Sequence, residues 1–212
     1  MSSVNHSLPC DVVILPGDEL VEKVVLASQK LAPFGSLFTL EVGRYFPHAS
    51  LFMLQLREDD IGMVKKLLAD IARTSSPLSL KASRFDSSQG YIDVEYARTE
   101  SIDNVQRRVI TALNTIRDGM RAKDAARMSE ATGLALENFR RYGYKYVGEL
   151  FRPHITFTRF DDGPDHAPEA RDVLPDISVF DGAFVKLGLF EMGDNGTCVR
   201  KIAEFDSQAE PG

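Results

Sequence analysis

Apolar residues fall into short strand-like runs that are separated by longer stretches with helical spacing. Leu20, Val24, Ala27 and Leu31 recur at the helical period, and Asp18 before them is an expected N-cap. The pattern predicts helices over 18–31, 61–72, 99–117 and, with a break near Gly133, 121–141. It predicts strands over 11–15, 37–42, 47–56, 78–85, 91–96, 153–160, 183–192 and 197–205.

Two pairs of strands are joined by short turn-forming segments. Asp86 to Gly90 links one pair, and Gly193-Asp194-Asn195-Gly196 links the last pair, where Asn-Gly is a strong hairpin signal. Residues 161–180 are rich in Asp and Pro and indicate a surface loop, which includes His166. Mixed helices and antiparallel connections predict an α+β fold and not a doubly wound parallel sheet.

The most informative feature is a short pattern that occurs twice. Phe46-Pro47-His48-Ala49-Ser50-Leu51 is echoed by Arg152-Pro153-His154-Ile155-Thr156-Phe157 in the second half of the chain. Side chains alternate along a strand, so each histidine shares a face with the hydroxyl two residues later, about 7 Å away. Two such pairs facing one cleft would supply an acid, a base and two hydroxyls for a phosphate.

This repeated His-x-[Ser/Thr]-apolar pattern resembles the two-histidine phosphoesterase superfamily, which includes bacterial RNA 2′,3′-cyclic phosphodiesterases. The second motif matches that family closely, whereas the first has Ala49 and Ser50 where a larger aliphatic residue and Thr are usual. The resemblance implies one bilobal domain over 1–212 with a central cleft between largely antiparallel sheets flanked by helices. Its parts would be a first-motif half (about 10–75), a second-motif half (about 76–160), the loop 161–180 and a C-terminal hairpin 181–206.

The resemblance also implies a chemistry, in which His48 and His154 act as acid and base while Ser50 and Thr156 bind the phosphate. The expected reaction is opening of a 2′,3′-cyclic phosphate on a nucleotide or RNA end, and the residues do not say which histidine is the base. Arg152 and Phe46 lie by alternation on the histidine side and are candidate substrate contacts. Arg159 falls on the opposite side by the same count and is left out.

No cofactor or metal is expected, because no second His or Cys lies near either motif in the sequence to complete a metal site. Cys10 and Cys198 suggest two buried thiols and not a disulfide framework. With 43% hydrophobic and 26% charged residues, the chain has the composition of an ordinary globular protein. The absence of a long apolar run or signal-like segment favours a cytoplasmic monomer without membrane contact.

A net charge of −6 argues against a long nucleic-acid footprint, because such binding depends on Lys and Arg neutralising phosphates. A small nucleotide or an RNA terminus is therefore the expected partner. The cluster Tyr142-Gly143-Tyr144-Lys145-Tyr146 could stack a base or could simply pack as a turn.

Three alternatives to this function stay open from the residues. The histidines could be ordinary hydrogen-bonded strand residues, or the chain could be a catalytically weak nucleotide-binding module, for which the relaxed first motif is the reason. A third alternative is a 2′–5′ RNA ligase or 2′–5′ phosphodiesterase of the same superfamily.

Overall fold

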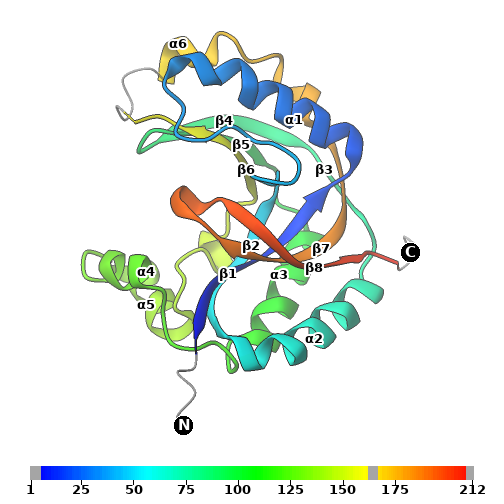
Figure 1. Cartoon of the computed structure of the whole chain (residues 1–212), viewed down its shortest axis with the longest axis vertical. Helices are drawn as coiled ribbons and strands as arrows, with labels where there is room; N and C mark the ends of the chain where they lie inside the picture. The colour runs from blue at the N-terminus through cyan, green and yellow to red at the C-terminus, as the bar shows by residue number, and fades with distance from the viewer. Residues whose placement is uncertain (1–5, 162–166, 209–212) are drawn as a thin grey trace.

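The structure is a computed structural model that describes residues 6–161 and 167–208. It has two lobes, each built on one sheet (Figure 1). The upper lobe in that view holds a three-stranded sheet with α1 and α6, and the lower lobe holds a five-stranded sheet with α2 and α3. A further helical pair, α4 and α5, lies on the left of the lower lobe. The predicted α+β class is confirmed.

The larger sheet has the order β2-β1-β7-β3. Strands β3 and β8 both pair with β7, β3 along its first residues and β8 along the rest. All of its pairings are antiparallel. Its strands are β1 (Ser7–Pro16), β2 (Ala49–Arg57), β3 (Leu78–Leu80), β7 (Gly182–Met192) and β8 (Cys198–Asp206). Helix α2 (Ile61–Arg73) packs on β7 and β8, and α3 (Glu100–Leu113) packs on β2.

The smaller sheet has the order β4-β5-β6 and is also antiparallel. Its strands are β4 (Ala82–Ser88), β5 (Tyr91–Tyr96) and β6 (His154–Arg159). Helix α1 (Asp18–Leu31) packs on β6. The remaining helices are α4 (Ala122–Met128), α5 (Gly133–Tyr142) and α6 (Ala167–Arg171).

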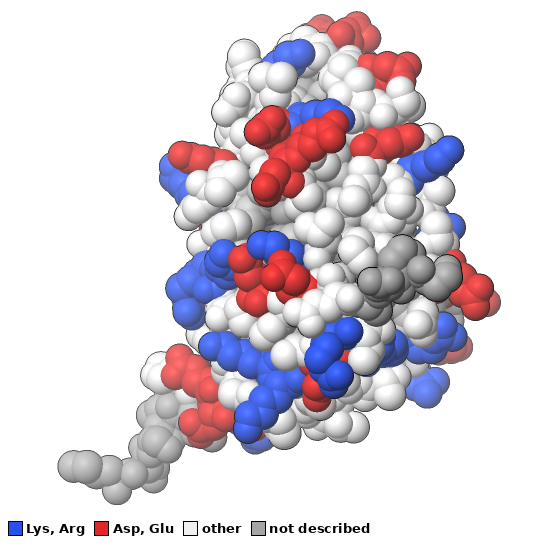
Figure 2. Space-filling model, turned by 90° about the vertical axis from the view of Figure 1, so that its right-hand side faces the viewer, with Lys and Arg blue, Asp and Glu red and all other residues white. Residues whose placement is uncertain are grey.

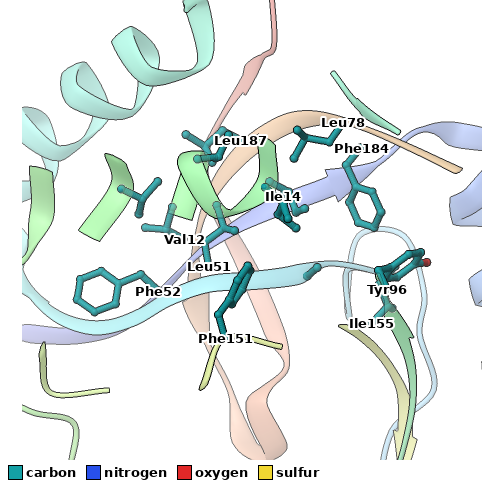
Figure 3. Close-up of a cluster of buried hydrophobic side chains, with 14 of the residues drawn as sticks. Val12, Ile14, Leu51, Phe52, Leu78, Tyr96, Phe151, Ile155, Phe184 and Leu187 are labelled. Carbon is teal, nitrogen blue, oxygen red and sulfur yellow. The ribbon is translucent and has the colours of Figure 1, made fainter. Parts of the chain in front are cut away.

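One continuous core joins the two lobes. Most of the side chains labelled in Figure 3 come from β1, β2, β3 and β7 of the larger sheet and from β5 and β6 of the smaller one, and Phe151 comes from the segment before β6. Tyr96 of β5 packs edge-on against Phe184 of β7, with ring centroids 5.2 Å apart. The sheets are therefore held as a unit, and each motif strand keeps a fixed position relative to the other.

Strand β2, which carries the first motif, contains one residue more than its neighbour. Val12 lies opposite Phe52 while Val13 lies opposite Ser50, so Leu51 has no partner on β1. This is a β-bulge three residues after His48.

Strand β6, which carries the second motif, has the same irregularity at the equivalent place. Ile92 lies opposite Thr158 while Asp93 lies opposite Thr156, so Phe157 is the extra residue. It too lies three residues after the histidine.

The carbonyl groups of both bulge residues are bonded to buried side chains from helices. Gln106 of α3 donates its Nε2–H to the Leu51 carbonyl at 3.1 Å, and Ser28 of α1 donates its hydroxyl to the Phe157 carbonyl at 2.6 Å. An unpaired buried carbonyl would destabilise the fold, so the two helices stabilise both bulges.

Most predicted elements are confirmed, with four local corrections. Helix α1 begins at Asp18 itself, and Gly17 is the N-cap. The predicted strand over 37–42 is wrong, because there the chain forms only isolated bridges. Its backbone is bonded to side chains instead: the Phe38 carbonyl accepts from Thr158, and the Leu40 amide donates to Ser28.

The predicted strand 78–85 is two strands, because the chain leaves the larger sheet after Leu80 and enters the smaller one at Ala82. Part of the predicted loop 161–180 is helical, since α6 and a 3₁₀ turn over Ile177–Phe180 lie within it. Phe180 anchors that turn, packing 5.1 Å from Phe157 between ring centroids. His166 lies outside the described residues.

We predict that Ser28→Ala and Gln106→Leu each lower the free energy of unfolding by about 1–3 kcal/mol, since each leaves buried backbone groups unpaired. Urea unfolding followed by circular dichroism measures this. Ser101→Ala, at an exposed position of α3, is the matched control and should change stability by less than about 0.5 kcal/mol. Wild-type stability in both buried variants would contradict the role given to these bonds.

Candidate functional site

A cleft of about 420 Å³ lies where the two motif strands meet. His48 and Ser50 line it from β2 and the residue before it, and His154 and Thr156 line it from β6. The structure thus brings together the four residues that the repeated motif singled out. Alternation along each strand places them there, because the intervening Ala49 and Ile155 are fully buried in the core.

Both imidazoles are held in the same way. Nδ1 of His48 lies 2.7 Å from the carbonyl oxygen of Phe46, and Nδ1 of His154 lies 2.7 Å from the carbonyl oxygen of Arg152. A carbonyl only accepts, so Nδ1 carries the proton in each ring. Nε2 of both rings is then the nitrogen left for a ligand or a proton transfer.

A buried carboxyl group lies beside each histidine–hydroxyl pair. Nε2 of His48 is 3.9 Å from Oδ2 of Asp11, and Nε2 of His154 is 4.0 Å from Oδ2 of Asp93. The Ser50 hydroxyl bonds Asp11 at 2.6 Å, and the Thr156 hydroxyl bonds Asp93. The two halves of the cleft therefore repeat a trio of imidazole, hydroxyl and carboxyl.

Burial shifts the proton affinity of these carboxyl groups. Asp11 is fully buried and Asp93 nearly so, and one carboxyl oxygen of each (Oδ1) has no hydrogen-bond partner among the described residues. Desolvation raises the pKa of Asp11 to about 7, against the lowering effects of Ser50 and Arg121. Desolvation likewise raises the pKa of Asp93, and the charge of His154 and the Thr156 bond oppose it.

The two histidines differ in their surroundings. The His48 side chain is 12% exposed and that of His154 is 20% exposed. Desolvation lowers the pKa of His48 to about 4; the backbone bonds to Phe46 and Gly196 oppose this shift, and the charge of His154 adds to it. His48 is consequently neutral at pH 7, with a free electron pair on Nε2.

The two predicted substrate contacts do not lie free in the cleft. The Phe46 ring is turned away from the cleft and packs on Phe190, with centroids 5.0 Å apart. In place of the expected ring contact with the substrate, Phe46 contributes its carbonyl group, which accepts a hydrogen bond from His48. Arg152 does line the cleft, but its guanidinium pairs with Asp86, Asp93 and Glu95 at 2.9, 3.1 and 2.7 Å. A phosphate would compete with these carboxylates for it.

Sequence reasoning missed Asp11, Asp93 and Arg159. Each aspartate interrupts an apolar strand run, which is the signal that could have found it. Arg159 was excluded by alternation, yet it bonds Asn195, a cleft residue, at 2.8 Å, because the bulge at Phe157 reverses the alternation beyond it.

The tyrosine cluster lies partly in the cleft. Tyr144 and Tyr146 line it and meet edge-on, with centroids 5.7 Å apart. Tyr144 is buried against Phe52 of β2. The packed-turn interpretation therefore fits Tyr144, while Tyr146 is half-buried at the cleft wall.

One group could hold a metal ion. Cys198 of β8 brings its sulfur near Asp11 and His48, with the three ligand atoms within 4.8 Å of one another. This corrects the expectation that no cysteine lies near either motif, since β8 is distant in sequence and adjacent in space. Desolvation raises the pKa of the Cys198 thiol well above its ordinary value, which disfavours the thiolate that a metal requires.

The fold is that of the two-histidine phosphoesterases, as the repeated motif led us to expect. E. coli LigT complexed with 3′-AMP is similar at 13% identity and a TM-score of 0.59, over 96% of this chain and 100% of LigT. TT0787 of Thermus thermophilus is similar at 15% identity and a TM-score of 0.56, over 96% and 100% of the two chains.

A family model places the chain more narrowly. Residues 52–178, more than half of the sequence, match the family described as "Protein of unknown function (DUF1045)", and the chain belongs to this family. No curated protein matches the sequence. Within the described residues, no helix combines the length and apolar character needed to cross a membrane.

We predict that Asp11→Asn removes a pH-dependent loss of stability. The folded pKa of Asp11 (about 7) lies above the ordinary value near 3.9, so the contribution of this group to stability is fully present below about pH 4 and is lost as pH rises through 7. Over that range the variant should gain up to roughly 4 kcal/mol relative to wild type. Urea unfolding at pH 4 and 8 measures this.

Asp70→Asn is the control for that measurement, because the Asp70 side chain is 70% exposed. If the free energy of unfolding differs between pH 4 and 8 by the same amount in Asp11→Asn as in wild type, a raised pKa of the buried Asp11 would be excluded.

Proposed function

We propose that this protein is a metal-independent cyclic phosphodiesterase that opens a 2′,3′-cyclic phosphate on a nucleotide or an RNA end. The observation that carries the proposal is the arrangement of the two imidazoles. Both line one cleft, both have Nδ1 fixed to a carbonyl, and both leave Nε2 for the substrate. A single phosphate between them would meet a base on one side and an acid on the other.

Solved structures with a similar fold are described as complexes with small phosphate compounds. E. coli LigT is described in complexes with 3′-AMP, phosphate, ATP and NADP+, and another similar structure is described as a phosphoesterase at 14% identity and a TM-score of 0.51. These names support a phosphoester-acting enzyme with a small nucleotide ligand. A net charge of −6 agrees with a small substrate and not with a long nucleic acid.

The reaction adds one water across a phosphorus–oxygen bond. The base Nε2 takes a proton from water, and the water oxygen bonds to phosphorus. The bond from phosphorus to the 2′ or 3′ oxygen then breaks, and the acid Nε2 gives its proton to that oxygen. Ligation would use the same groups with a ribose 5′-hydroxyl attacking in place of water. Cleavage of a 2′–5′ linkage back to the cyclic phosphate would reverse that step, with the two ring nitrogens exchanging roles.

The surroundings of the two rings favour one division of roles in hydrolysis. His48 has its pKa lowered to about 4 and holds no proton on Nε2 at pH 7, so it is the base. His154 is then the acid. Oδ2 of Asp93 lies 4.0 Å from its Nε2.

The hydroxyls of Ser50 and Thr156 would donate to the non-bridging oxygens of the phosphate. A hydroxyl has a single proton, and here it is directed at the carboxyl group. A protonated carboxyl would donate to the hydroxyl oxygen and free the hydroxyl proton for the substrate, and the burial that raises the pKa of Asp11 and Asp93 favours this form. Charge that builds on the phosphate is then met by two donors already in place.

We predict that His48→Ala or His154→Ala lowers kcat for adenosine 2′,3′-cyclic phosphate by about 10²–10⁴-fold in EDTA, because each removes one proton transfer. Ser50→Ala and Thr156→Ala should each lower it by about 10²–10³-fold through loss of a donor to the transition state. Phosphorus NMR follows the conversion of cyclic phosphate to monoester.

His6→Ala is the matched control, since His6 is exposed and outside the cleft, and it should retain full turnover. Undiminished activity in either cleft histidine variant would rule out the two-histidine mechanism. Binding of 3′-AMP by a wild-type protein that yields no product from any cyclic, 2′–5′ or 3′–5′ substrate would favour the nucleotide-binding module instead.

A further inference from the structure

One wall of the cleft is cationic. Arg121, Lys123 and Arg127, from α4 and the residue before it, line the same cavity as the two histidines. Arg159 reaches this wall from the end of β6, and its charge acts on Lys123 together with those of the two other arginines. Four positive charges therefore gather beside the reacting centre of a protein whose net charge is −6.

Carboxylates neutralise only part of this charge. Asp124 pairs closely with Arg121, at 2.7 Å from its Nε, and lies 3.9 Å from Arg127. Lys123 has no ion pair or hydrogen bond to any described residue. Asp93 and Asp194 are the acidic residues among the described residues that line the cleft.

Arg159 is held in place without a carboxylate partner among the described residues. Its NH1 group donates to Asn195 at 2.8 Å, its Nε donates to the Gln89 carbonyl at 3.3 Å, and its guanidinium lies 5.0 Å from the Tyr91 ring centroid. These neutral contacts fix the position of the charge, and no described carboxylate pairs with it, as expected of an anion-binding arginine.

The cations also repel one another. Desolvation, followed by the charges of Arg127, Arg159 and Arg121, lowers the pKa of Lys123. Such a cluster destabilises the fold by itself, and a bound anion would relieve the repulsion.

The charge on this wall is not part of a basic surface that covers the molecule. On the right-hand side of the molecule as seen in Figure 1, away from α4 and α5, basic and acidic side chains are interspersed (Figure 2). Within the cleft, Arg152 is already matched by three carboxylates. The unmatched positive charge of the cleft is concentrated on the α4 wall.

The geometry points to a second phosphate subsite formed by Lys123, Arg127 and Arg159, so that the substrate carries a non-reacting phosphate besides its cyclic phosphodiester. This inference rests on the proposed function and specifies its substrate class. A terminal phosphomonoester, with about two negative charges, suits the cluster better than the single charge of a phosphodiester. The same chemistry could come from a small molecule or from the next phosphate of an RNA end.

Three substrates that share one reacting group test the inference. They are adenosine 2′,3′-cyclic phosphate, the same compound with a 5′-phosphate, and a dinucleotide that ends in a 2′,3′-cyclic phosphate. We expect kcat/KM to be at least about tenfold higher with the 5′-phosphate, since two or more charge-assisted bonds are gained. The paired change Lys123→Met and Arg127→Met should abolish that advantage and leave the unphosphorylated substrate within about twofold.

Arg140→Met is the matched control, because Arg140 is exposed on α5 and does not line the cleft; it should keep the whole advantage. A kcat/KM for the dinucleotide as high as that for the 5′-phosphorylated compound would support the subsite and assign it to RNA ends. Equal kcat/KM for the compounds with and without the second phosphate would overturn the inference and leave the proposed function standing.

Binding measurements distinguish a failure of the proposed subsite from a failure of the proposed reaction. Calorimetry with 3′-AMP and adenosine 3′,5′-bisphosphate reports the subsite without turnover, and we expect the bisphosphate to bind at least about tenfold more tightly. If no cyclic substrate reacts, the proposed reaction fails, while the subsite is still supported by tighter bisphosphate binding in wild type than in the paired variant. Equal affinity for the two compounds would overturn it.

Discussion

The geometry of the cleft depends on one hydrogen bond in each lobe, between a bulge carbonyl and a buried helix side chain. An extra residue in an antiparallel strand leaves a carbonyl that the neighbouring strand cannot pair. Here Gln106 donates to the carbonyl of Leu51, and Ser28 donates to that of Phe157. Without them each motif strand would favour a regular register, and every side chain beyond the bulge would move to the other face.

The bulges explain why the two lobes form similar half-sites on strands that share little sequence. Before each bulge, a histidine and a hydroxyl point to the cleft. After it, the alternation is reversed, so Met53 and Gln55 line the cleft from β2 and Arg159 reaches its wall from β6. The carboxyl groups come from the adjacent strands β1 and β5, where a regular sheet would have buried an apolar residue. Their desolvation reduces stability above neutral pH, a penalty that is consistent with a role in positioning the hydroxyls.

Much of this arrangement could be predicted from the sequence, because the two motifs and the alternation of side chains are local properties. The α+β class, the hairpins and the convergence of His48 with His154 follow from pattern and resemblance. What could not be predicted depends on the tertiary structure. Arg159 was assigned to the wrong face because a bulge has no sequence signature here. Phe46 was expected to face the substrate, but it lies outside strand β2 and its ring packs on Phe190.

Two further features escaped the sequence for the same reason. Cys198 lies far from His48 along the chain and beside it in space, since β8 pairs with β7 next to β1. The cationic wall combines residues near α4 with the last residue of β6, which no spacing rule would join. The predicted strand over 37–42 failed because Ser28 and Thr158 bond to its backbone in place of a neighbouring strand.

Whether both imidazoles act on a single phosphate is tested most directly by NMR observation of the two Cε1–H signals during titration with 3′-AMP. We expect both signals to shift together with one dissociation constant, and we expect adenosine, which lacks the phosphate, to reproduce neither shift. A shift of one imidazole alone, or two different dissociation constants, would contradict it.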